Sequence, residues 1–133
     1  MELLLVFVII GVLVAVAVPA YASFVGPARA AAARSNLRAA IPAAEQLRVA
    51  SANQNYAGIS GAVLRNLDPG VGVTVSAVAV HSNLGYCLQA TDDGSAPYYY
   101  YVGGNPGPAL QPGYVVATVA PGLCLDAVGV ASG

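Results

Sequence analysis

An uncharged, apolar run from Leu3 to Ala22 opens this 133-residue chain. A helix of roughly 20 apolar residues is long enough to cross the hydrocarbon core of a bilayer. A secretory signal peptide would carry a basic leader before such a run and a small-residue cleavage site after it. Glu2 stands where that leader should be. The sequence therefore predicts a membrane-spanning helix, in a processed or truncated chain whose Met1 need not be a translation start.

Two residues inside this run weaken a helix. Pro19 lacks a backbone donor and clashes with the preceding turn, so it should kink the helix or open its hydrogen bonding. Gly11 adds a second weak point because glycine leaves helical geometry easily. The pair Gly26-Pro27 predicts a further bend. Residues 1–26 are predicted to form a hydrophobic, membrane-spanning N-terminal helix.

Residues 27–55 have the pattern of an amphipathic helix rich in alanine, the strongest helix former. Apolar residues recur at spacings of three and four: Ala33, Leu37, Ala40, Ala44 and Leu47. Charged residues fall on another face: Arg34, Arg38, Glu45 and Arg48. Glu45 and Arg48 have the spacing of an ion pair on one helix. Pro42 should bend this helix without ending it, and the end is predicted near Ser51–Asn55.

Residues 56–133 are predicted to form a β-sheet domain, because they hold most of the glycine, proline and tyrosine and several β-branched runs. The predicted strands are Val71–Val80, Leu84–Ala90, Pro97–Val102 and Tyr114–Ala120. Asp92-Asp93-Gly94 is a turn signal between two of them, and Gly103–Gly113 is predicted to be a loop. The predicted fold class is α+β, with a long kinked N-terminal helix packed on a C-terminal antiparallel sheet.

The chain carries little charge for its size. Charged residues make up 8% and hydrophobic residues 57% of the chain, whereas a soluble domain has about 25% charged residues. Much of the surface should therefore face lipid or other subunits. There is no lysine and the net charge is −1, which argues against nucleic-acid binding through a broad basic surface.

The two cysteines, Cys87 and Cys124, both lie in the C-terminal half. Neither belongs to a CxxC motif or a Cys/His cluster, so a zinc site is disfavoured. The pair predicts one disulfide formed in an oxidising compartment, with a pair of free thiols as the alternative.

The residues from Met1 to Tyr21 resemble the start of a mature type IV pilin. Members of this family have a glutamate, a run of Leu, Val and Ile, a glycine, an alanine-rich stretch, and a proline followed by an aromatic residue. The matching positions here are Glu2, Gly11, Pro19 and Tyr21. The remainder matches the family only in layout, as a helix, a sheet and a C-terminal loop closed by two cysteines. The family's methylated first residue and basic leader would precede Met1.

This resemblance implies a structural subunit that polymerises into an extracellular type IV pilus serving motility, adhesion or DNA uptake. It implies identical subunits in a helical filament, an inner or cytoplasmic membrane location before assembly, and pilus assembly machinery as partner. It implies that Glu2 pairs with a neighbouring subunit's N-terminal amine, and that the helix between Gly11 and Pro19 opens in the filament. No enzyme activity, cofactor, metal or small-molecule substrate is expected.

Several alternatives stay open. Glu2 is also favoured in the first turn of any helix, and membrane helices tolerate breakers such as Gly11 and Pro19. A type II secretion pseudopilin shares the N-terminal layout but typically has a C-terminal calcium site in place of the disulfide. A lone membrane-anchored binding module would give Glu2 no role.

The remaining candidate residues have simpler interpretations. The run Tyr98–Tyr101 predicts a strand whose alternate side chains face the core and the outside. Asp92, Asp93 and Asp126 could share a calcium ion, although a turn already explains the first two. His81, the only histidine, is predicted to be a loop or surface residue. No motif of a nucleophile, a zinc protease or a phosphate loop is present.

Overall fold

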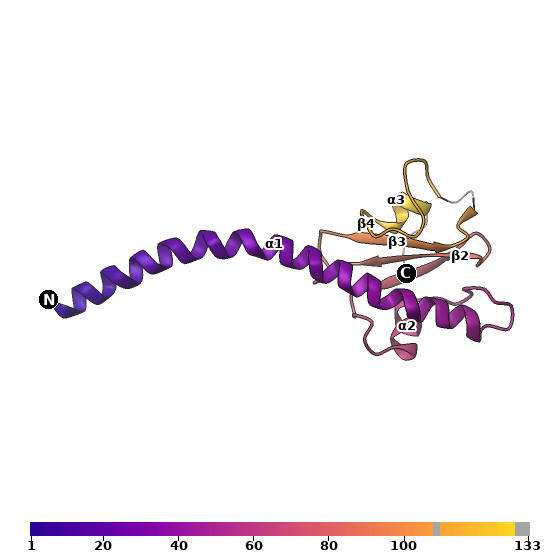
Figure 1. Cartoon of the computed structure of the whole chain (residues 1–133), viewed down its shortest axis with the longest axis horizontal. Coiled ribbons are helices and arrows are strands. Elements are labelled where there is room, and N and C mark those ends of the chain that lie inside the picture. Colours follow the sequence, from indigo (N-terminus) through magenta and orange to yellow (C-terminus); the bar gives the residue numbers. More distant parts are fainter. Residues whose placement is uncertain (108–109, 130–133) are drawn as a thin grey trace.

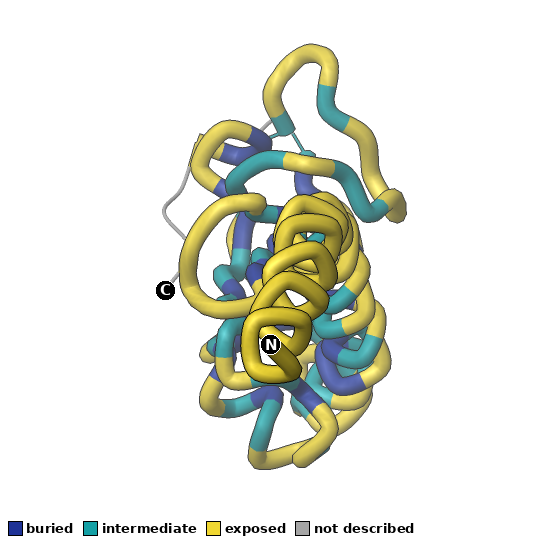
Figure 2. The backbone as a smooth tube through the Cα atoms, turned by 90° about the vertical axis from the view of Figure 1, so that its left-hand side faces the viewer, coloured by how far each residue is buried: buried dark blue, intermediate teal, exposed yellow. Residues whose placement is uncertain are grey.

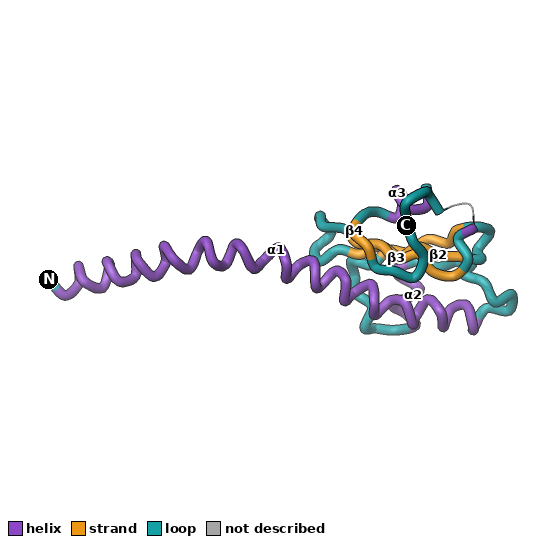
Figure 3. Tube along the Cα trace, turned by 45° about the horizontal axis from the view of Figure 1, so that its top comes forward, coloured by secondary structure: helices purple, strands orange, loops and turns teal. Residues whose placement is uncertain are grey.

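The computed structural model describes residues 1–107 and 110–129 and has the predicted α+β layout (Figure 1). A 49-residue helix, α1 (Glu2–Ala50), begins the chain. Its C-terminal half packs on a small antiparallel sheet, and its N-terminal half extends away from the domain (Figures 1 and 3). The molecule thus consists of an extended N-terminal helical segment and a compact C-terminal domain.

Helix α1 is continuous through all three of its prolines, Pro19, Pro27 and Pro42. The predicted bend at Gly26-Pro27 does not interrupt it, although Figure 1 shows that the helix is bowed. All three prolines are exposed, so solvent or another partner can reach the carbonyls that they leave without a helical hydrogen bond, and proline is a usual cause of helix bending. The helix ends at Ala50, and the N–H of Ser51 caps it, which confirms the predicted end.

Four antiparallel strands form the sheet in the order β1-β2-β3-β4. They are β1 (Ser76–Val80), β2 (Gly85–Ala90), β3 (Tyr99–Gly104) and β4 (Ala120–Pro121). Strands consecutive in the sequence are neighbours in the sheet. Asp92-Asp93-Gly94 lies in the connection between β2 and β3, as predicted, but within a longer loop of residues 91–98.

Three predictions about strands were inaccurate. The first strand begins at Ser76 instead of Val71, because residues 71–75 form turns. The predicted strand Tyr114–Ala120 was wrong, since only Ala120 of that run pairs in the sheet. Ala117 has a left-handed φ of 60°, which breaks an extended strand. Gly103 and Gly104, predicted to be loop, complete β3 opposite β2.

Two short helices were not predicted: α2 (Gly61–Leu67) and α3 (Cys124–Val128). The hydroxyl of Ser60 accepts a hydrogen bond from the N–H of Val63 and so caps α2. Neither helix is long enough to show a clear 3.6-residue period, which explains why the sequence pattern did not reveal them.

The sheet is covered on both faces. On one face, the predicted apolar face of α1 is fully buried at Ala33, Leu37, Ala40 and Ala44, and Leu47 is partly buried. These residues pack with alternate sheet residues, including Tyr86 and Leu88 of β2. On the other face, α3 packs in a second core. Its buried members are Val80, Cys87, Tyr100, Val102, Cys124, Ala127 and Val128. Figure 1 shows α1 and α3 on opposite sides of the sheet.

Candidate assembly helix and its attachment to the sheet domain

The N-terminal half of α1 is uncovered. Residues 1–24 are all exposed (Figure 2), and Leu3 and Phe24, near the two ends of this stretch, are 76% and 72% exposed. Monomeric soluble proteins rarely expose apolar patches larger than a few hundred Å². In the described part of the chain, α1 is the one helix long and apolar enough to cross a membrane. This apolar half therefore requires lipid or other protein around it.

Glu2 lies in the first turn of α1 and is exposed. Within the described residues its carboxylate makes no ion pair. It is the single charged side chain between Met1 and Ala28. A carboxylate at that tip is compatible both with the helix dipole and with a partner from outside the chain.

Gly11 and Pro19 both lie inside the continuous helix of this single chain. Nothing lies within 4 Å of the position that a Cβ of residue 11 would occupy. The opening of the helix between these residues was predicted for the assembled filament and stays a prediction.

The C-terminal end of α1 is fastened to the sheet through Glu45. Its carboxylate accepts hydrogen bonds from the hydroxyls of Tyr56 and Tyr86, at 3.0 and 3.1 Å, and from the Nε of Arg48 at 3.2 Å. The rings of Tyr56 and Tyr86 also contact each other, with centroids 4.5 Å apart. The predicted pairing of Glu45 with Arg48 is confirmed. The sequence placed Glu45 on a charged helix face that points to solvent. In the structure its carboxylate also contacts Tyr86 of the sheet.

Both tyrosine hydroxyls in this cluster stay protonated. Burial raises the pKa of Tyr56 to about 12, and the hydrogen bond to the Glu45 carboxylate and its charge add to the shift. Burial likewise raises the pKa of Tyr86, with the charge of Glu45 as the next cause. Because a phenolate would lie against the carboxylate, the hydroxyls remain donors throughout the neutral range.

We expect Tyr56→Phe to lower the free energy of unfolding by about 1–2 kcal/mol at pH 7. A hydrogen bond to a charged group contributes about 1.5–3 kcal/mol, and the partly exposed Glu45 places this one near the lower end. The folded-state pKa lies above the unfolded value of 10.0, so this contribution is present below pH 10 and is lost as the pH rises toward 12. Chemical denaturation at pH 7 and pH 11 should therefore show a smaller difference between wild type and variant at pH 11.

Tyr98→Phe is the matched control for that measurement. The Tyr98 hydroxyl donates one hydrogen bond, to the carbonyl of Gly94 in an exposed loop, so its loss should have little effect at either pH. A Tyr56→Phe variant as stable as this control would show that the Glu45 cluster does not fasten α1.

Two further contacts fasten the middle of α1. The guanidinium of Arg34 lies 4.7 Å from the ring centroid of Tyr99 and donates to its hydroxyl at 3.3 Å. Arg29 forms an ion pair with Asp93 in the β2–β3 loop at 3.2 Å. These cross-links, like the Glu45 cluster, join residues far apart in the sequence, and no local pattern predicted them.

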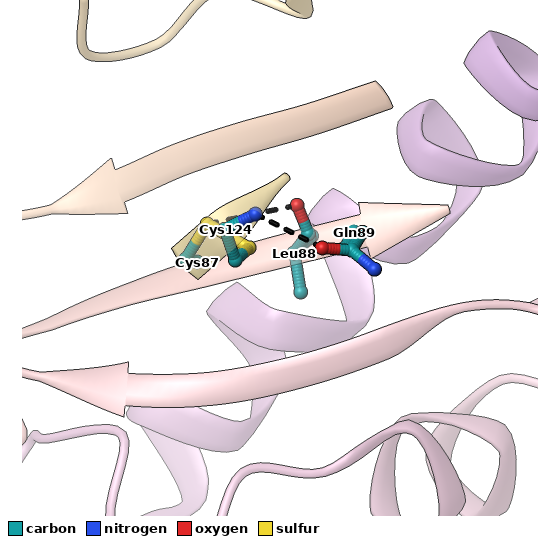
Figure 4. The surroundings of a disulfide bond; sticks show 4 residues. All are labelled: Cys87, Leu88, Gln89 and Cys124. Atoms are coloured by element: carbon teal, nitrogen blue, oxygen red, sulfur yellow. Dashed lines mark hydrogen bonds between the residues drawn. A yellow bond between two sulfur atoms is a disulfide. The ribbon is translucent and has the colours of Figure 1, made fainter. Parts of the chain in front are cut away.

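Cys87 of β2 and Cys124 of α3 form a disulfide across 37 residues of sequence. Both are fully buried in the second core. Next to the disulfide, the N–H of Cys124 donates to the side-chain carbonyl of Gln89 at 2.9 Å (Figure 4). The bond closes the segment that contains β3 and holds α3 against the sheet.

The tyrosine run alternates as predicted, with one correction. Tyr99 and Tyr101 pack with the α1 core, while Tyr100 is buried in the second core. The face predicted to be outside is therefore covered by α3 and by residues near Tyr114, whose ring lies 5.4 Å from that of Tyr100.

The other candidate residues do not come together. Asp92 and Asp93 lie beside α1, whereas Asp126 lies on α3, on the opposite face of the sheet. In the described residues, no group of three or more His, Cys, Asp or Glu side chains could hold a metal ion. His81 lies in the turn after β1, as expected, with its Nδ1 3.1 Å from the carbonyl oxygen of Asn105.

Comparison with protein-family models, with curated proteins and with solved structures finds no significant match to this chain. The functional assignment therefore depends on its own residues and their geometry.

Proposed function

We propose that this chain is the structural subunit of a type IV pilus, an extracellular filament of identical subunits. One observation carries the proposal: a single helix is built into a folded domain by one half and leaves the other half apolar and uncovered, with a carboxylate at its tip. The order of glutamate, glycine and proline in that half, which resembles the start of mature pilins, supports the same proposal.

The two halves of α1 suit two environments in turn. Before assembly, the half from Leu3 to Ala22 spans the membrane, and the sheet domain stays outside the bilayer. In the filament, the apolar halves of many copies pack together along the axis and the sheet domains form the outer surface. Motility, adhesion and DNA uptake are all tasks that such a filament can serve, with force supplied by separate assembly machinery.

Glu2 would specify how subunits dock. Apolar helices gain little by leaving lipid for one another, so packing alone selects neither a neighbour nor its height. A carboxylate at the edge of the bilayer core is unfavourable without a partner. Pairing with the N-terminal amine of a neighbouring subunit removes that cost and fixes the register.

The competing proposals differ in what they require of the domain. A type II secretion pseudopilin would share α1, but in that family a C-terminal calcium site typically replaces the disulfide that closes the C-terminal region here. A lone membrane-anchored module would use α1 only as an anchor. Shearing cells that produce this chain together with pilus assembly machinery separates the proposals. Long filaments containing this chain support the pilus, whereas protein confined to the membrane fraction contradicts it.

We expect α1 to lose regular helical hydrogen bonding between Gly11 and Pro19 in the filament. A proline in a helix interior costs about 3 kcal/mol, and Gly11 lowers the cost of leaving helical geometry. Close packing of many copies can shield the carbonyls that are set free. A filament density map should show extended or irregular backbone in this stretch.

Pro19→Ala supplies the comparison for that map. Alanine restores the missing donor and the best helix propensity, so the variant's density should be more regular at the same resolution. Unbroken helical density through residues 11–19 in the unsubstituted filament would disprove the expectation.

A further inference from the structure

A shallow cavity of about 480 Å³ lies where α1 leaves the domain. One wall is a stripe of α1 whose members recur at spacings of three and four: Tyr21, Phe24, Val25, Ala28 and Ala32. Residues with this spacing share one face of a helix. The stripe directly precedes the face that the sheet covers from Ala33 onward. Ala28 and Ala33, like Ala32 and Leu37, are five residues apart, so at 3.6 residues per turn the stripe lies on a face of α1 adjoining the buried one.

The other lining residues are charged. Arg29 and Asp92 both border the cavity, and Asp93 holds Arg29 from the β2–β3 loop at 3.2 Å. A guanidinium has five N–H donors, so this ion pair leaves most of them free for a second acceptor. Both partners are close to half exposed, at 46% and 42%. Asp92 is exposed as well, so the cavity is lined by an accessible cation and an accessible carboxylate.

Polarity changes along the length of the cavity. Its end toward the N-terminus holds Tyr21 and Phe24, which are 74% and 72% exposed. Its end toward the domain holds Arg29 and Asp92. Helix side chains tilt toward the N-terminus, which is the direction in which the apolar end of the cavity lies. A ligand that fits must be apolar at one end and zwitterionic at the other.

The position of this cavity relative to a bilayer matches that polarity. If Leu3–Ala22 spans the hydrocarbon core, Tyr21 and Phe24 fall at its edge, where amphipathic aromatic side chains are favoured. Arg29 then lies about 10 Å further along the helix, at a rise of 1.5 Å per residue. The lipid headgroups occupy roughly 5–8 Å on each side of the core. The Arg29 backbone therefore lies just beyond them, and its long side chain must extend back toward the N-terminus to reach a headgroup.

We propose that this cavity binds one phospholipid whose headgroup carries a phosphate and a primary ammonium. The phosphate accepts hydrogen bonds from Arg29, the ammonium pairs with Asp92, and the start of an acyl chain lies along Tyr21 and Phe24. The inference rests on the proposed function only in that it places α1 in a bilayer.

The charges distinguish this headgroup from its common alternatives. A primary ammonium has three N–H donors and can approach a carboxylate closely, whereas a quaternary choline has none. An anionic headgroup without a cation would satisfy Arg29 but would face the carboxylates of Asp92 and Asp93 without compensation. A neighbouring copy of α1 could also cover the stripe, but from Leu3 to Ala28 it offers no charged side chain to Asp92.

Native mass spectrometry of the full chain, released from nanodiscs, tests the proposal. The nanodiscs would contain equal amounts of phosphatidylcholine, phosphatidylethanolamine and phosphatidylglycerol. We expect phosphatidylethanolamine to stay bound at several-fold excess over the other two. Asp92→Asn should reduce it to the level of phosphatidylcholine, and Arg29→Gln should reduce retention of all three.

Asp126→Asn and Arg38→Gln are the matched controls, because each removes the same charge elsewhere on the protein. Asp126 lies on α3 across the sheet, and Arg38 lies further along α1 and is exposed. Both should retain phosphatidylethanolamine as wild type does. Equal retention of the three lipids by wild type, preference for phosphatidylglycerol, or unchanged retention by Asp92→Asn would overturn the proposal.

Filament yield from the same variants separates this inference from the proposed function. Filaments from a chain that shows no headgroup preference would remove the lipid site and leave the pilus proposal standing. Absence of filaments from wild type, together with selective lipid retention, would contradict the pilus and keep the lipid site.

Discussion

Replacing Glu2 with alanine should leave membrane insertion intact and abolish stable filaments. Insertion is driven by the apolar run from Leu3 to Ala22, which the substitution does not touch. Assembly depends on a directional contact, because apolar packing alone gives helices little reason to leave lipid for one another. Breaking a charge pair in a low-dielectric setting costs about 3–5 kcal/mol per contact, and each subunit added to a filament would lose one.

Glu2→Gln tests whether charge is the decisive property. Glutamine keeps the size of the side chain and one hydrogen-bond acceptor but carries no charge, so it cannot form an ion pair with an ammonium group. It should therefore fail to form filaments almost as completely as alanine. Leu3→Ala, which removes apolar area next to Glu2 without changing charge, should retain most of the filament yield.

The measurement is the amount of subunit in the membrane fraction compared with the amount in sheared filaments. Both Glu2 variants should match wild type in the first quantity and fall at least tenfold in the second. Normal filament yield from both would remove Glu2 from the mechanism and leave only the packing of apolar helices.

Removing the disulfide should produce the largest loss of stability in the sheet domain. For a loop closed by residues 37 apart, the chain-entropy model predicts that Cys87→Ala with Cys124→Ala lowers the free energy of unfolding by about 4 kcal/mol. Proteins of this size are stable by about 5–15 kcal/mol, so much of the margin would be lost. Alanine avoids burying a hydroxyl at these fully buried positions.

Denaturant unfolding with and without reductant checks this expectation. Reductant should destabilise the wild type toward the level of the double variant and should leave the double variant unchanged. The loss should appear first as release of α3 and exposure of Tyr100, because the disulfide holds α3 over the second core. Alkylation of both thiols in the native protein without reductant would show instead that the bond does not form.

The features of α1 could be predicted because they are periodic or continuous. Its apolar run needs only a count of residues, and the burial of Leu37, Ala40 and Ala44 follows from the 3.6-residue repeat. The alternation of Tyr99 and Tyr100 follows equally from the two-residue repeat of a strand. The burial pattern of these elements follows from the spacing of nearby residues, so it could be predicted from a single sequence.

Other elements depend on contacts that no local spacing records. The segment Tyr114–Val119 is β-branched and looks like a strand, but the left-handed Ala117 turns it away from the sheet, with the N–H of Ala117 donating to the carbonyl of Val102. Glu45 was predicted only to pair with Arg48, because its other partners, Tyr56 and Tyr86, are 11 and 41 residues away.

The same limit applies to the candidate site. Gly11 and Pro19 were chosen from the sequence because they interrupt an otherwise uniform apolar run, Glu2 because it is the charged residue at the tip of that run, and all three because they match the start of mature pilins. The cavity at the base of the domain was not foreseen, because it needs Asp92 to lie beside Arg29, and that closeness exists only once the β2–β3 loop folds against α1.

Helical reconstruction from electron micrographs of filaments made by this chain tests the central claim most directly. The claim is that the uncovered half of α1 is the surface through which copies assemble. The map should show the segments from Leu3 to Phe24 bundled along the filament axis, each Glu2 next to a neighbour's N-terminus, and the sheet domains outside. Filaments held together only by contacts between sheet domains, with the apolar halves of α1 apart from one another, would contradict it.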